Sequence, residues 1–391
     1  MAGEGLTKKQ AMNNLVILIR NKLLHFLYVS TLKPIYFRRD PEEVHDVMIQ
    51  IGEFLGRYAI TRNITSLVFC FTHPMLEQNI FGMHFSNPIG LAAGFDKDAL
   101  LTDILPSVGF GFEEIGSITG EPCQGNPKPR LWRLKRSRSL VVYYGLKNEG
   151  CEKVSARLHQ KKFKIPIGTN IAKTNSPGTV ETTAGISDYV KAFRQLVDVG
   201  QYFTINISCP NTFGGELFTE PDRLDQLLSA IDLVPTKKPI FLKLSPDLKE
   251  EQLEAILQIC KHHRVNGFIC SNLTKIRDTE KINDEAIPSW GGISGKAVED
   301  LSNAQIRFIY KKMGNEYAII GCGGIFSAED AYVKIKAGAS LVQLITGMIF
   351  EGPQLISEIN RGLVQLLKKD GFQSIVEARG AGKLHPQQTI A

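Results

Sequence analysis

The 391-residue sequence has no uninterrupted apolar run of about 18 residues, the length a membrane-spanning helix needs. It also lacks a cysteine framework, because its seven cysteines are an odd number and no two of them form a C-x-x-C pair. This usage argues against structural disulfides or zinc and favours a reducing compartment. The excess of 46 basic over 40 acidic side chains is too small to indicate nucleic-acid binding. We therefore expect neither a metal site nor a nucleic-acid partner.

Two nucleotide-binding signatures are missing as well. No Rossmann glycine fingerprint follows a strand pattern, which argues against a built-in nicotinamide site. The segment 291–297 superficially resembles a P-loop, but its spacing is short and Ala297 stands where Ser or Thr is required. No fixed-period repeat or low-complexity segment is apparent.

The composition is that of a globular protein, with 43% hydrophobic and 22% charged residues. The hydrophobic pattern changes near residue 85, from helical spacing to short apolar runs separated by helical stretches. We predict an N-terminal helical module over 1–80, a main domain over 81–380 and a frayed tail over 381–391.

The N-terminal module has two apolar segments, 15–19 and 23–29, separated by Arg20, Asn21 and Lys22. The polar break argues against a signal peptide and favours a segment that lies on a membrane. Asp40 and Pro41 predict the start of a second helix. Its apolar stripe has two interpretations. It packs against the main domain, or it forms an apolar docking surface or the mouth of a tunnel. The stripe consists of Val44, Val47, Met48, Ile51, Phe54 and Leu55.

The main domain contains eight predicted strands, each followed by a helical interval. They span 89–93, 112–117, 165–170, 203–208, 240–245, 267–272, 318–321 and 341–346. Helical intervals imply parallel pairing, and eight such units predict a closed (β/α)8 TIM barrel of the α/β class with its chemistry at the strand C-terminal ends. An open doubly wound sheet is the alternative.

Polar side chains gather at these predicted strand ends. They include the asparagines Asn170, Asn206, Asn211 and Asn272 and the lysines Lys97 and Lys243. Converging carboxamides suit a flat ligand whose edge alternates carbonyl and N–H groups, such as a pyrimidine or a flavin, although a single asparagine is more often a turn former. Lys243 closes an apolar strand, where a buried cation needs an anion; the alternative is a lysine that extends to the surface.

Glycines and one cysteine add to this pattern. Gly323 and Gly324 follow the seventh strand and Gly347 follows the eighth, where barrels commonly bind a phosphate. Cys209 lies just past a strand end, before a glycine-containing segment able to close over a ligand. A thiol near an electropositive mouth can ionise and accept a proton. Cys270 and Cys322 fall inside strands and are predicted to be core residues.

Taken together, several separated segments resemble dihydroorotate dehydrogenase. The matching segments are 87–97, 116–119, 125–130, 206–211, 292–296 and 338–343, and the resemblance covers roughly 35–378. The N-terminal module, with Asp40, Pro41, Glu42 and His45, resembles the extension of the membrane-associated, quinone-dependent branch.

The resemblance implies a flavoprotein that uses FMN to oxidise dihydroorotate to orotate in pyrimidine (UMP) synthesis and passes the electrons to a membrane quinone. Cys209 would be the catalytic base, and His45 and Arg133 would line the quinone tunnel. The substrate would be held by Lys97, Asn206, Asn211 and Asn272. The FMN would be held by Ala92, Ala93, Gly94, Gly116, Ser117, Asn170, Asn206, Lys243, Ser271, Gly295, Gly324 and Thr346.

Four positions depart from the family pattern. Cys209 is typical of the soluble branch, whereas the quinone-dependent branch uses serine. A substrate-binding asparagine of the family falls on Val142, with Asn148 as a candidate replacement. A tunnel tyrosine falls on Ile345, and a substrate-side threonine falls on Leu273.

Two other functions stay open at this point. One is a related flavin barrel that reduces another pyrimidine or an enone with a nicotinamide donor, and the other is a non-catalytic barrel that docks on membranes. The N-terminus has few arginines and contains Glu4, so it is a poor transit peptide. We therefore expect peripheral association with the cytoplasmic side of a bacterial inner membrane, with the mitochondrial inner membrane as the alternative.

Overall fold

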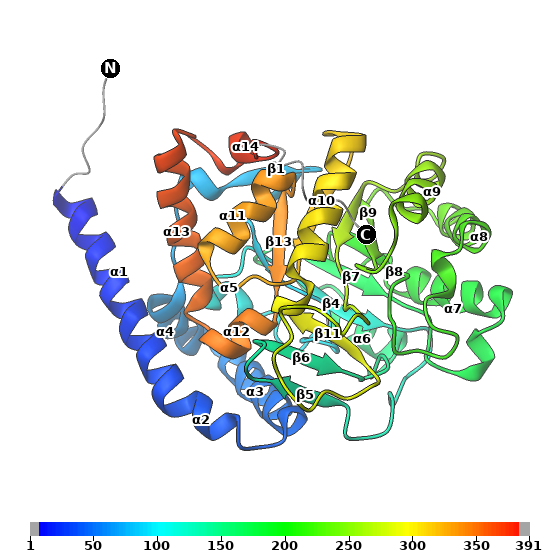
Figure 1. Ribbon diagram of the computed structural model, residues 1–391, viewed down its shortest axis with the longest axis horizontal. Coiled ribbons are helices and arrows are strands. Elements are labelled where there is room, and N and C mark those ends of the chain that lie inside the picture. Colours follow the sequence, from blue (N-terminus) through cyan, green and yellow to red (C-terminus); the bar gives the residue numbers. More distant parts are fainter. Residues whose placement is uncertain (1–7, 383–391) are drawn as a thin grey trace.

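The computed structural model describes residues 8–382, and its centre is a closed barrel of eight parallel strands (Figure 1). In order around the barrel the strands are β3 (Ile89–Leu91), β4 (Phe112–Ile118), β7 (Ile167–Ile171), β8 (Tyr202–Asn206), β9 (Ile240–Leu244), β10 (Gly267–Cys270), β12 (Ala318–Cys322) and β13 (Leu341–Leu344). Each lies on one of the eight predicted strands, so the (β/α)8 prediction is confirmed and the open sheet is excluded.

Helices surround the barrel because each strand returns to the same end of the sheet through a helical crossover. They are α5 (Leu105–Val108), α6 (Cys151–Leu158), α7 (Thr182–Gln195), α8 (Pro221–Asp232), α9 (Glu250–Cys260), α10 (Glu299–Met313), α11 (Ala328–Ala337), α12 (Thr346–Glu351), α13 (Leu355–Asp370) and α14 (Ile375–Ala378). Single 3₁₀ turns span Pro74–Leu76, Pro177–Thr179, Leu217–Thr219 and Lys296–Val298. Most of the predicted tail, 383–391, lies outside the described residues.

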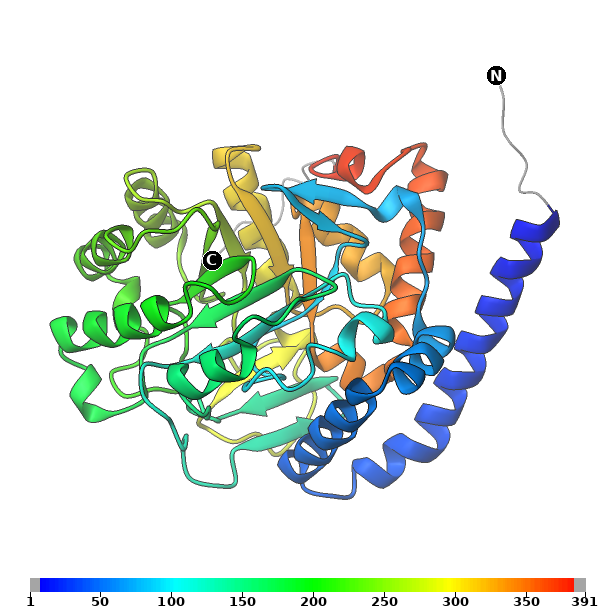
Figure 2. The ribbon, with the colours of Figure 1, turned by 180° about the vertical axis from the view of Figure 1, so that it is seen from behind.

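The amino-terminal end of the barrel is plugged by a hairpin of β1 (Gln78–Ile80) and β2 (Met83–Phe85), visible across the end of the barrel in Figure 2. Phe85 packs edge-on against Phe112 with ring centroids 5.6 Å apart. Both rings belong to a fully buried aromatic cluster at this end. Ligand chemistry is thereby directed to the opposite, carboxyl end of the strands.

A second sheet lies over the carboxyl end and was not predicted from the sequence. It is antiparallel and consists of β5 (Leu131–Leu134), β6 (Ser139–Val142) and β11 (Gly292–Gly295). Each strand has four residues, and β6 pairs with a strand about 150 residues further along the chain. Such short, distant pairings leave no periodic signal in the sequence.

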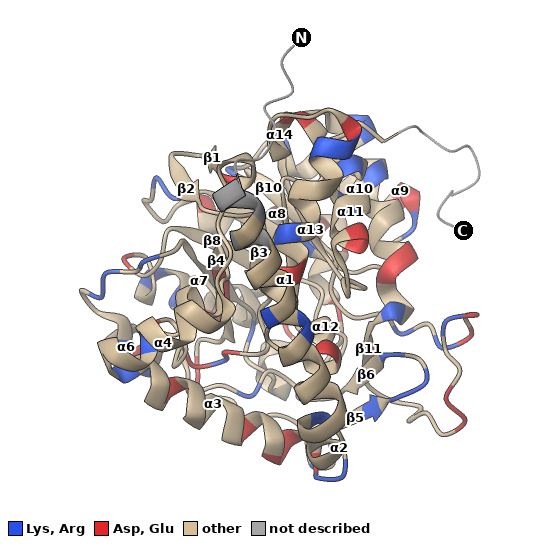
Figure 3. Ribbon diagram, turned by 90° about the vertical axis from the view of Figure 1, so that its left-hand side faces the viewer, with Lys and Arg blue, Asp and Glu red and all other residues tan. Residues whose placement is uncertain are grey.

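The N-terminal module is helical, as predicted. Helix α1 (Lys8–Leu27) continues through a π-helical turn (Tyr28–Leu32) into α2 (Lys33–Tyr36), and is followed by α3 (Pro41–Arg57) and α4 (Ala59–Phe69). The Asp40 carboxylate accepts hydrogen bonds from the amides of Glu42 and Glu43 and caps α3, as its sequence predicts. Figure 3 shows α1 crossing the outer face of the barrel, where it packs on α13.

Two of the polar residues between the apolar segments 15–19 and 23–29, Arg20 and Asn21, face the barrel. The Arg20 guanidinium donates to Ser357 Oγ (2.8 Å) and to Leu67 O (2.9 Å), and Asn21 Nδ2 donates to Ser357 Oγ at 3.1 Å. The side chains on the opposite side of α1 are apolar and more than half exposed, namely Leu15, Val16, Ile19, Leu23 and Phe26. The stretch Leu15–Tyr36 is long and apolar enough to cross a membrane, but two of its polar groups anchor it to α13.

Candidate functional site

One large cavity of about 530 Å³ opens at the carboxyl ends of the barrel strands. Its inner part is formed by the strand ends, and its outer part extends between α2, α3 and α12. The charged residues in its wall are Lys97, Arg133, Lys147 and Lys243, and no described aspartate or glutamate belongs to the wall. A wall that carries only positive charge suits an anionic ligand.

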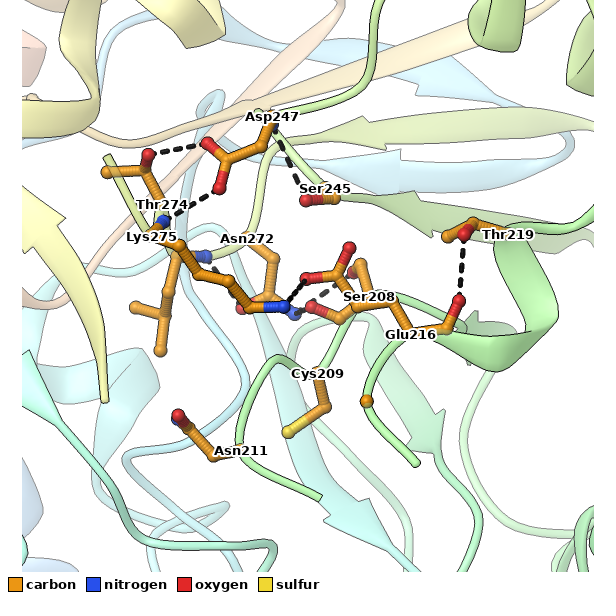
Figure 4. A network of polar contacts seen from close by, with 12 residues as sticks. Ser208, Cys209, Asn211, Glu216, Thr219, Ser245, Asp247, Asn272, Thr274 and Lys275 are labelled. Atoms are coloured by element: carbon orange, nitrogen blue, oxygen red, sulfur yellow. Dashed lines mark hydrogen bonds and ion pairs between the residues drawn. The ribbon is translucent and has the colours of Figure 1, made fainter. Parts of the chain in front are cut away.

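Three of the predicted polar residues form a hydrogen-bonded group in this wall. Asn272 Nδ2 donates to Asn206 Oδ1 (3.2 Å) and to Ser208 O (2.9 Å). Asn206 Nδ2 in turn donates to Ser117 Oγ at 3.0 Å. Asn272 follows β10, Asn206 is the last residue of β8 and Ser117 lies near the end of β4, so the barrel brings together side chains that are far apart in the sequence. Figure 4 shows Asn272 beside Ser208, with Cys209 and Asn211 below them.

Lys97 lies at the junction of the inner and outer parts of the cavity. Its ammonium is 4.2 Å from the centre of the Tyr144 ring and 3.4 Å from His45 Nε2. Burial, followed by the nearby charge of Lys147, lowers the pKa of Lys97 to about 8. A lysine with this pKa stays mostly protonated at neutral pH, and an anionic ligand beside it would raise the pKa again.

Lys243 and Ser271 are polar groups on the inner wall that lack protein partners. Lys243 is 4% exposed, and no described residue forms an ion pair or hydrogen bond with it. Ser271 Oγ is buried and has no hydrogen-bond partner among the described residues. Because an unpaired buried cation is unfavourable, the inner wall is built for a group that supplies negative charge and hydrogen bonds. The alternative in which Lys243 extends to the surface is wrong.

The glycine-rich segments also border the cavity. Gly94, with φ of +108°, is a position where an added Cβ would meet no heavy atom within 4 Å, so its backbone faces open space. Gly323, Gly324, Thr346 and Gly347 lie in the same wall. Thr346 Oγ1 is 2.8 Å from Ser294 Oγ of β11, which ties the second sheet to this end of the barrel.

Asn170 is the one predicted cofactor residue that does not line the cavity. It is fully buried in β7, and its Nδ2 donates to Glu114 Oε1 at 2.7 Å, whereas its Oδ1 has no partner among the described residues. The other eleven predicted cofactor residues and all four predicted substrate residues belong to the cavity wall. The barrel therefore gathers at one site nearly all the residues predicted for it.

Cys209 lies in the wall beside Asn206 and Asn211. The pKa of its thiol is raised to about 11, mainly by burial and also by the nearby Glu216 carboxylate, against the lowering effects of the Asn211 amide and Lys173. The expectation of a readily ionised thiol is therefore wrong for the protein without bound ligand, because desolvation outweighs the nearby positive charge. The segment after Cys209 is tethered rather than free, since Glu216 forms an ion pair with Lys275 at 3.6 Å (Figure 4).

The outer part of the cavity is lined by the N-terminal module. His45 Nε2 donates to Phe95 O at 2.8 Å, and burial lowers the pKa of the imidazole, with Lys97 lowering it further. Arg133 stacks on Phe37, 4.7 Å from the ring centre, and both line the cavity. From the apolar stripe of α3, Val44, Met48, Ile51 and Leu55 line the cavity, whereas Val47 and Phe54 are exposed. The stripe thus forms a tunnel wall as well as an outer surface.

Two interpretations of single residues need correction. Asn148 does not line the cavity: its amide donates to Thr119 Oγ1 and Leu146 O (both 2.8 Å), so it is a structural residue rather than a replacement ligand. Cys322 is not a core residue, because it lines the cavity close enough to Lys243 for that charge to lower its pKa against the raising effect of burial. Cys270 is fully buried, as predicted. Val142, Leu273 and Ile345 all line the cavity.

Sequence reasoning gave no role to four residues that the structure places at or near the site. Tyr144 holds its ring against Lys97, and Glu42 on α3 forms a two-point ion pair with Arg130, at 2.9 and 2.7 Å. The pair fastens the N-terminal module to the segment before β5. Lys173 is the second residue after β7, so its place near a strand end was a usable signal, whereas nothing in the sequence links Glu42 to Arg130.

Comparisons with known proteins agree on one family. The family model for dihydroorotate dehydrogenase matches residues 75–367. Proteins named dihydroorotate dehydrogenase (quinone) from Nostoc punctiforme and Trichodesmium erythraeum are 39% and 36% identical, each over 90% of this chain and 98% of its own length. Among solved structures, ligand-free DHODH from Eimeria tenella superimposes with a TM-score of 0.78 at 29% identity, covering 88% of this chain and all of that chain.

Proposed function

The chain belongs to the dihydroorotate dehydrogenase family, and we propose that it oxidises dihydroorotate to orotate in pyrimidine biosynthesis and passes the electrons to a quinone. The observation that carries this proposal is the single cavity, whose inner wall holds converging asparagines and unpaired cations and whose outer part is apolar and formed by the N-terminal helices. One cavity thus offers a polar place for a pyrimidine acid and an apolar passage for a quinone.

Enzymes of this family are generally flavin-dependent, and we propose FMN as the flavin. The unpaired Ser271 hydroxyl, the unpaired Lys243 ammonium and the open space at Gly94 fit such a group. Bound flavin would accept a hydride from C6 of the substrate. The residues proposed to hold it are those of the predicted set that line the cavity, namely Ala92, Ala93, Gly94, Gly116, Ser117, Asn206, Lys243, Ser271, Gly295, Gly324 and Thr346.

Substrate positioning is proposed for Lys97, Asn206, Asn211 and Asn272. The carboxamides supply donors and acceptors for the edge of the pyrimidine, and the Lys97 ammonium supplies positive charge for its carboxylate. Asn211 is preoriented, because its Nδ2 donates to Val142 O at 2.8 Å. Cys209 would act as the base that removes the proton from C5. The proton would move to the cysteine sulfur, which must then release it before the next turnover.

We propose that the N-terminal module, 1–80, associates with the membrane surface and feeds quinone to the barrel, 81–380. Exposed apolar side chains on α1 and α3 support this, as does the continuity of the cavity with α2 and α3. His45 and Arg133 would line the quinone passage. We propose peripheral attachment to the cytoplasmic side of a bacterial inner membrane; the anchoring of α1 on α13 supports the peripheral mode of attachment.

A steady-state assay tests the proposal against its rivals. Purified holoenzyme is supplied with dihydroorotate and, in turn, a short-chain quinone, fumarate, NAD or oxygen, and orotate formation is followed by absorbance. We expect quinone to be the preferred oxidant. Reduction of uracil by NADPH without oxidation of dihydroorotate would favour the related flavin reductase instead. A purified protein without flavin absorbance would favour a non-catalytic barrel.

A further inference from the structure

A buried lysine lies behind Cys209, on the side away from the main cavity. Lys173 follows β7 and is 4% exposed. With Cys209 it lines a second, much smaller cavity, to which Tyr189 and Thr212 also contribute. Cys209 belongs to the walls of both cavities, as do Asn206 and Leu146, so it lies between the proposed substrate site and the small cavity that Lys173 lines.

The hydrogen bonds of Lys173 are all to neutral groups. Its Nζ donates to Phe213 O at 2.9 Å and lies 3.4 Å from Thr179 Oγ1. No described carboxylate forms an ion pair with it. Phe213 belongs to the same loop as Cys209, four residues further along, so Lys173 fastens that loop to the barrel. A buried cation without an ion pair is unfavourable, and a thiolate at Cys209 would supply negative charge near Lys173 in addition to the charge of Asp188.

We propose that Lys173 is a positioning residue for the reaction: it stabilises the thiolate form of Cys209 and holds the Cys209 loop against the barrel. This rests on the proposed role of Cys209 as the base. When the thiolate takes a proton from the substrate it becomes a neutral thiol and Lys173 loses its counter-charge. Release of that proton from the thiol restores the ion pair for the next turnover.

Of the two charged side chains that act on the Cys209 thiol, only Lys173 favours the thiolate. Burial raises the pKa of Cys209, and Glu216, which faces the thiol from the same loop, raises it further. The amide of Asn211 and the charge of Lys173 lower it. Burial lowers the pKa of Lys173, whereas Cys209, Asp188 and Cys123 raise it. Lys275 is paired with Glu216 and therefore offsets that carboxylate.

The test is the rate at which iodoacetamide alkylates Cys209 at about pH 9, followed by mass spectrometry of the peptide that contains it. Only the thiolate reacts, so the rate at a fixed pH below the thiol pKa reports the thiolate fraction. We expect the rate to fall about tenfold in Lys173→Met and Lys173→Gln, since losing a nearby charge shifts a pKa by about one unit or more. Lys173→Arg, which keeps the charge, should stay within about twofold of wild type.

The variants separate charge from anchoring. Lys173→Gln keeps a donor for Phe213 O without the charge, whereas Lys173→Met loses both. A loop anchor alone would give wild-type rates in Lys173→Gln and faster alkylation in Lys173→Met, because a loosened loop exposes the thiol; that result would overturn the proposal, as would unchanged rates in both. Lys238→Met is the matched control, because Lys238 also donates to two carbonyls, Val197 O (2.6 Å) and Val199 O (3.0 Å).

The readout needs no substrate. Failure of all variants and of wild type to oxidise dihydroorotate would count against the proposed function, while the alkylation rates would still decide the role of Lys173.

Discussion

The Cys209 thiol would carry the proton chemistry of this site, although burial raises its pKa to about 11. A base with such a pKa is mostly protonated at neutral pH, so the reaction should speed up as the pH rises toward the pKa of the thiol in the substrate complex. The same residue type in an exposed loop would ionise more easily. The environment of Cys209 therefore sets the pH range in which the site works.

We predict that Cys209→Ser keeps measurable flavin reduction by dihydroorotate and that its pH–rate profile moves to higher pH, because an alcohol ionises with a higher pKa than a thiol. Stopped-flow mixing, with the loss of flavin absorbance as the signal, measures the rate of flavin reduction and its dependence on pH. Cys70→Ser is the control, since the Cys70 thiol contacts the carbonyls of Pro106 and Ser107 outside the cavity. A Cys209→Ser profile that coincides with wild type would remove Cys209 as the base.

A second prediction concerns the buried pair of Glu42 and Arg130, which are 3% and 6% exposed. Replacing Arg130 with Met leaves the Glu42 carboxylate buried beside the more exposed Lys128 and Lys147, and the free energy of unfolding at pH 7 should fall by about 3 kcal/mol. Urea titration measures the loss. Arg136→Met is the matched control, because its pair with Glu285 is exposed and should change stability by less than about 1 kcal/mol.

The pH dependence of this effect has a defined sign. Burial alone would raise the pKa of Glu42, but the hydrogen bond and charge of Arg130, together with Lys128 and Lys147, lower it overall. A carboxyl whose pKa is lowered by folding stabilises the protein above its unfolded pKa and loses that contribution as the pH falls through the folded value. The difference between wild type and Arg130→Met should therefore shrink below about pH 4. An equal difference at pH 7 and at acid pH would contradict this assignment.

At the scale of elements, the feature that distinguishes this chain is the way α1 is attached. Its polar residues bind α13, and Tyr28, which follows α1, donates to Ile349 O at 2.7 Å and lines the outer cavity. A helix held in this way would lie on a membrane with its apolar face toward the lipid and would not cross it. The same attachment places Tyr28, in the π-helical turn directly after α1, in the cavity wall.

Removal of residues 1–35 should release the protein from membranes, because it deletes the exposed apolar face of α1. A sharper variant is the double change Leu23→Glu and Phe26→Glu, at positions 56% and 65% exposed, which should abolish flotation with anionic lipid vesicles and leave the fold unchanged. Leu233→Glu, on the far side of the barrel at 79% exposed, is the matched control. Undiminished flotation of the double variant would show that another surface binds the lipid.

At the scale of the whole molecule, residues in or directly after seven of the eight barrel strands, all except β7, line the cavity, so ligand binding there should stabilise the entire fold. Adding FMN to flavin-free protein should raise the melting temperature, with about 2.7 kcal/mol of stabilisation at a hundredfold excess over Kd. Riboflavin, which lacks the phosphate, should give a smaller shift. Lys243→Met should weaken the effect of FMN, because it removes the unpaired inner cation. Equal shifts with FMN and riboflavin would argue against a phosphate site at Gly323, Gly324 and Thr346.

The comparison of sequence with structure shows where local patterns suffice. The eight barrel strands and the capped start of α3 were predictable, because apolar runs and helix caps depend on residues that are neighbours in the sequence. The sheet of β5, β6 and β11 was not, since its strands are short and pair over long separations. Asn148 and Asn170 both follow predicted polar patterns, yet their amides are used inside the protein. Whether a carboxamide faces a ligand or a neighbour is decided by packing.

The sequence by itself determined the barrel, the family and most of the residues that meet at its rim, because strand periodicity and motif spacing are local properties of the chain. Only the tertiary structure decided that Lys243 is a buried cation without a partner, that Arg20 and Asn21 dock α1 on the barrel, and that Lys173 lies behind Cys209. Charge compensation and desolvation depend on which groups surround a side chain in space. Those neighbours come from distant segments, so no local pattern records them.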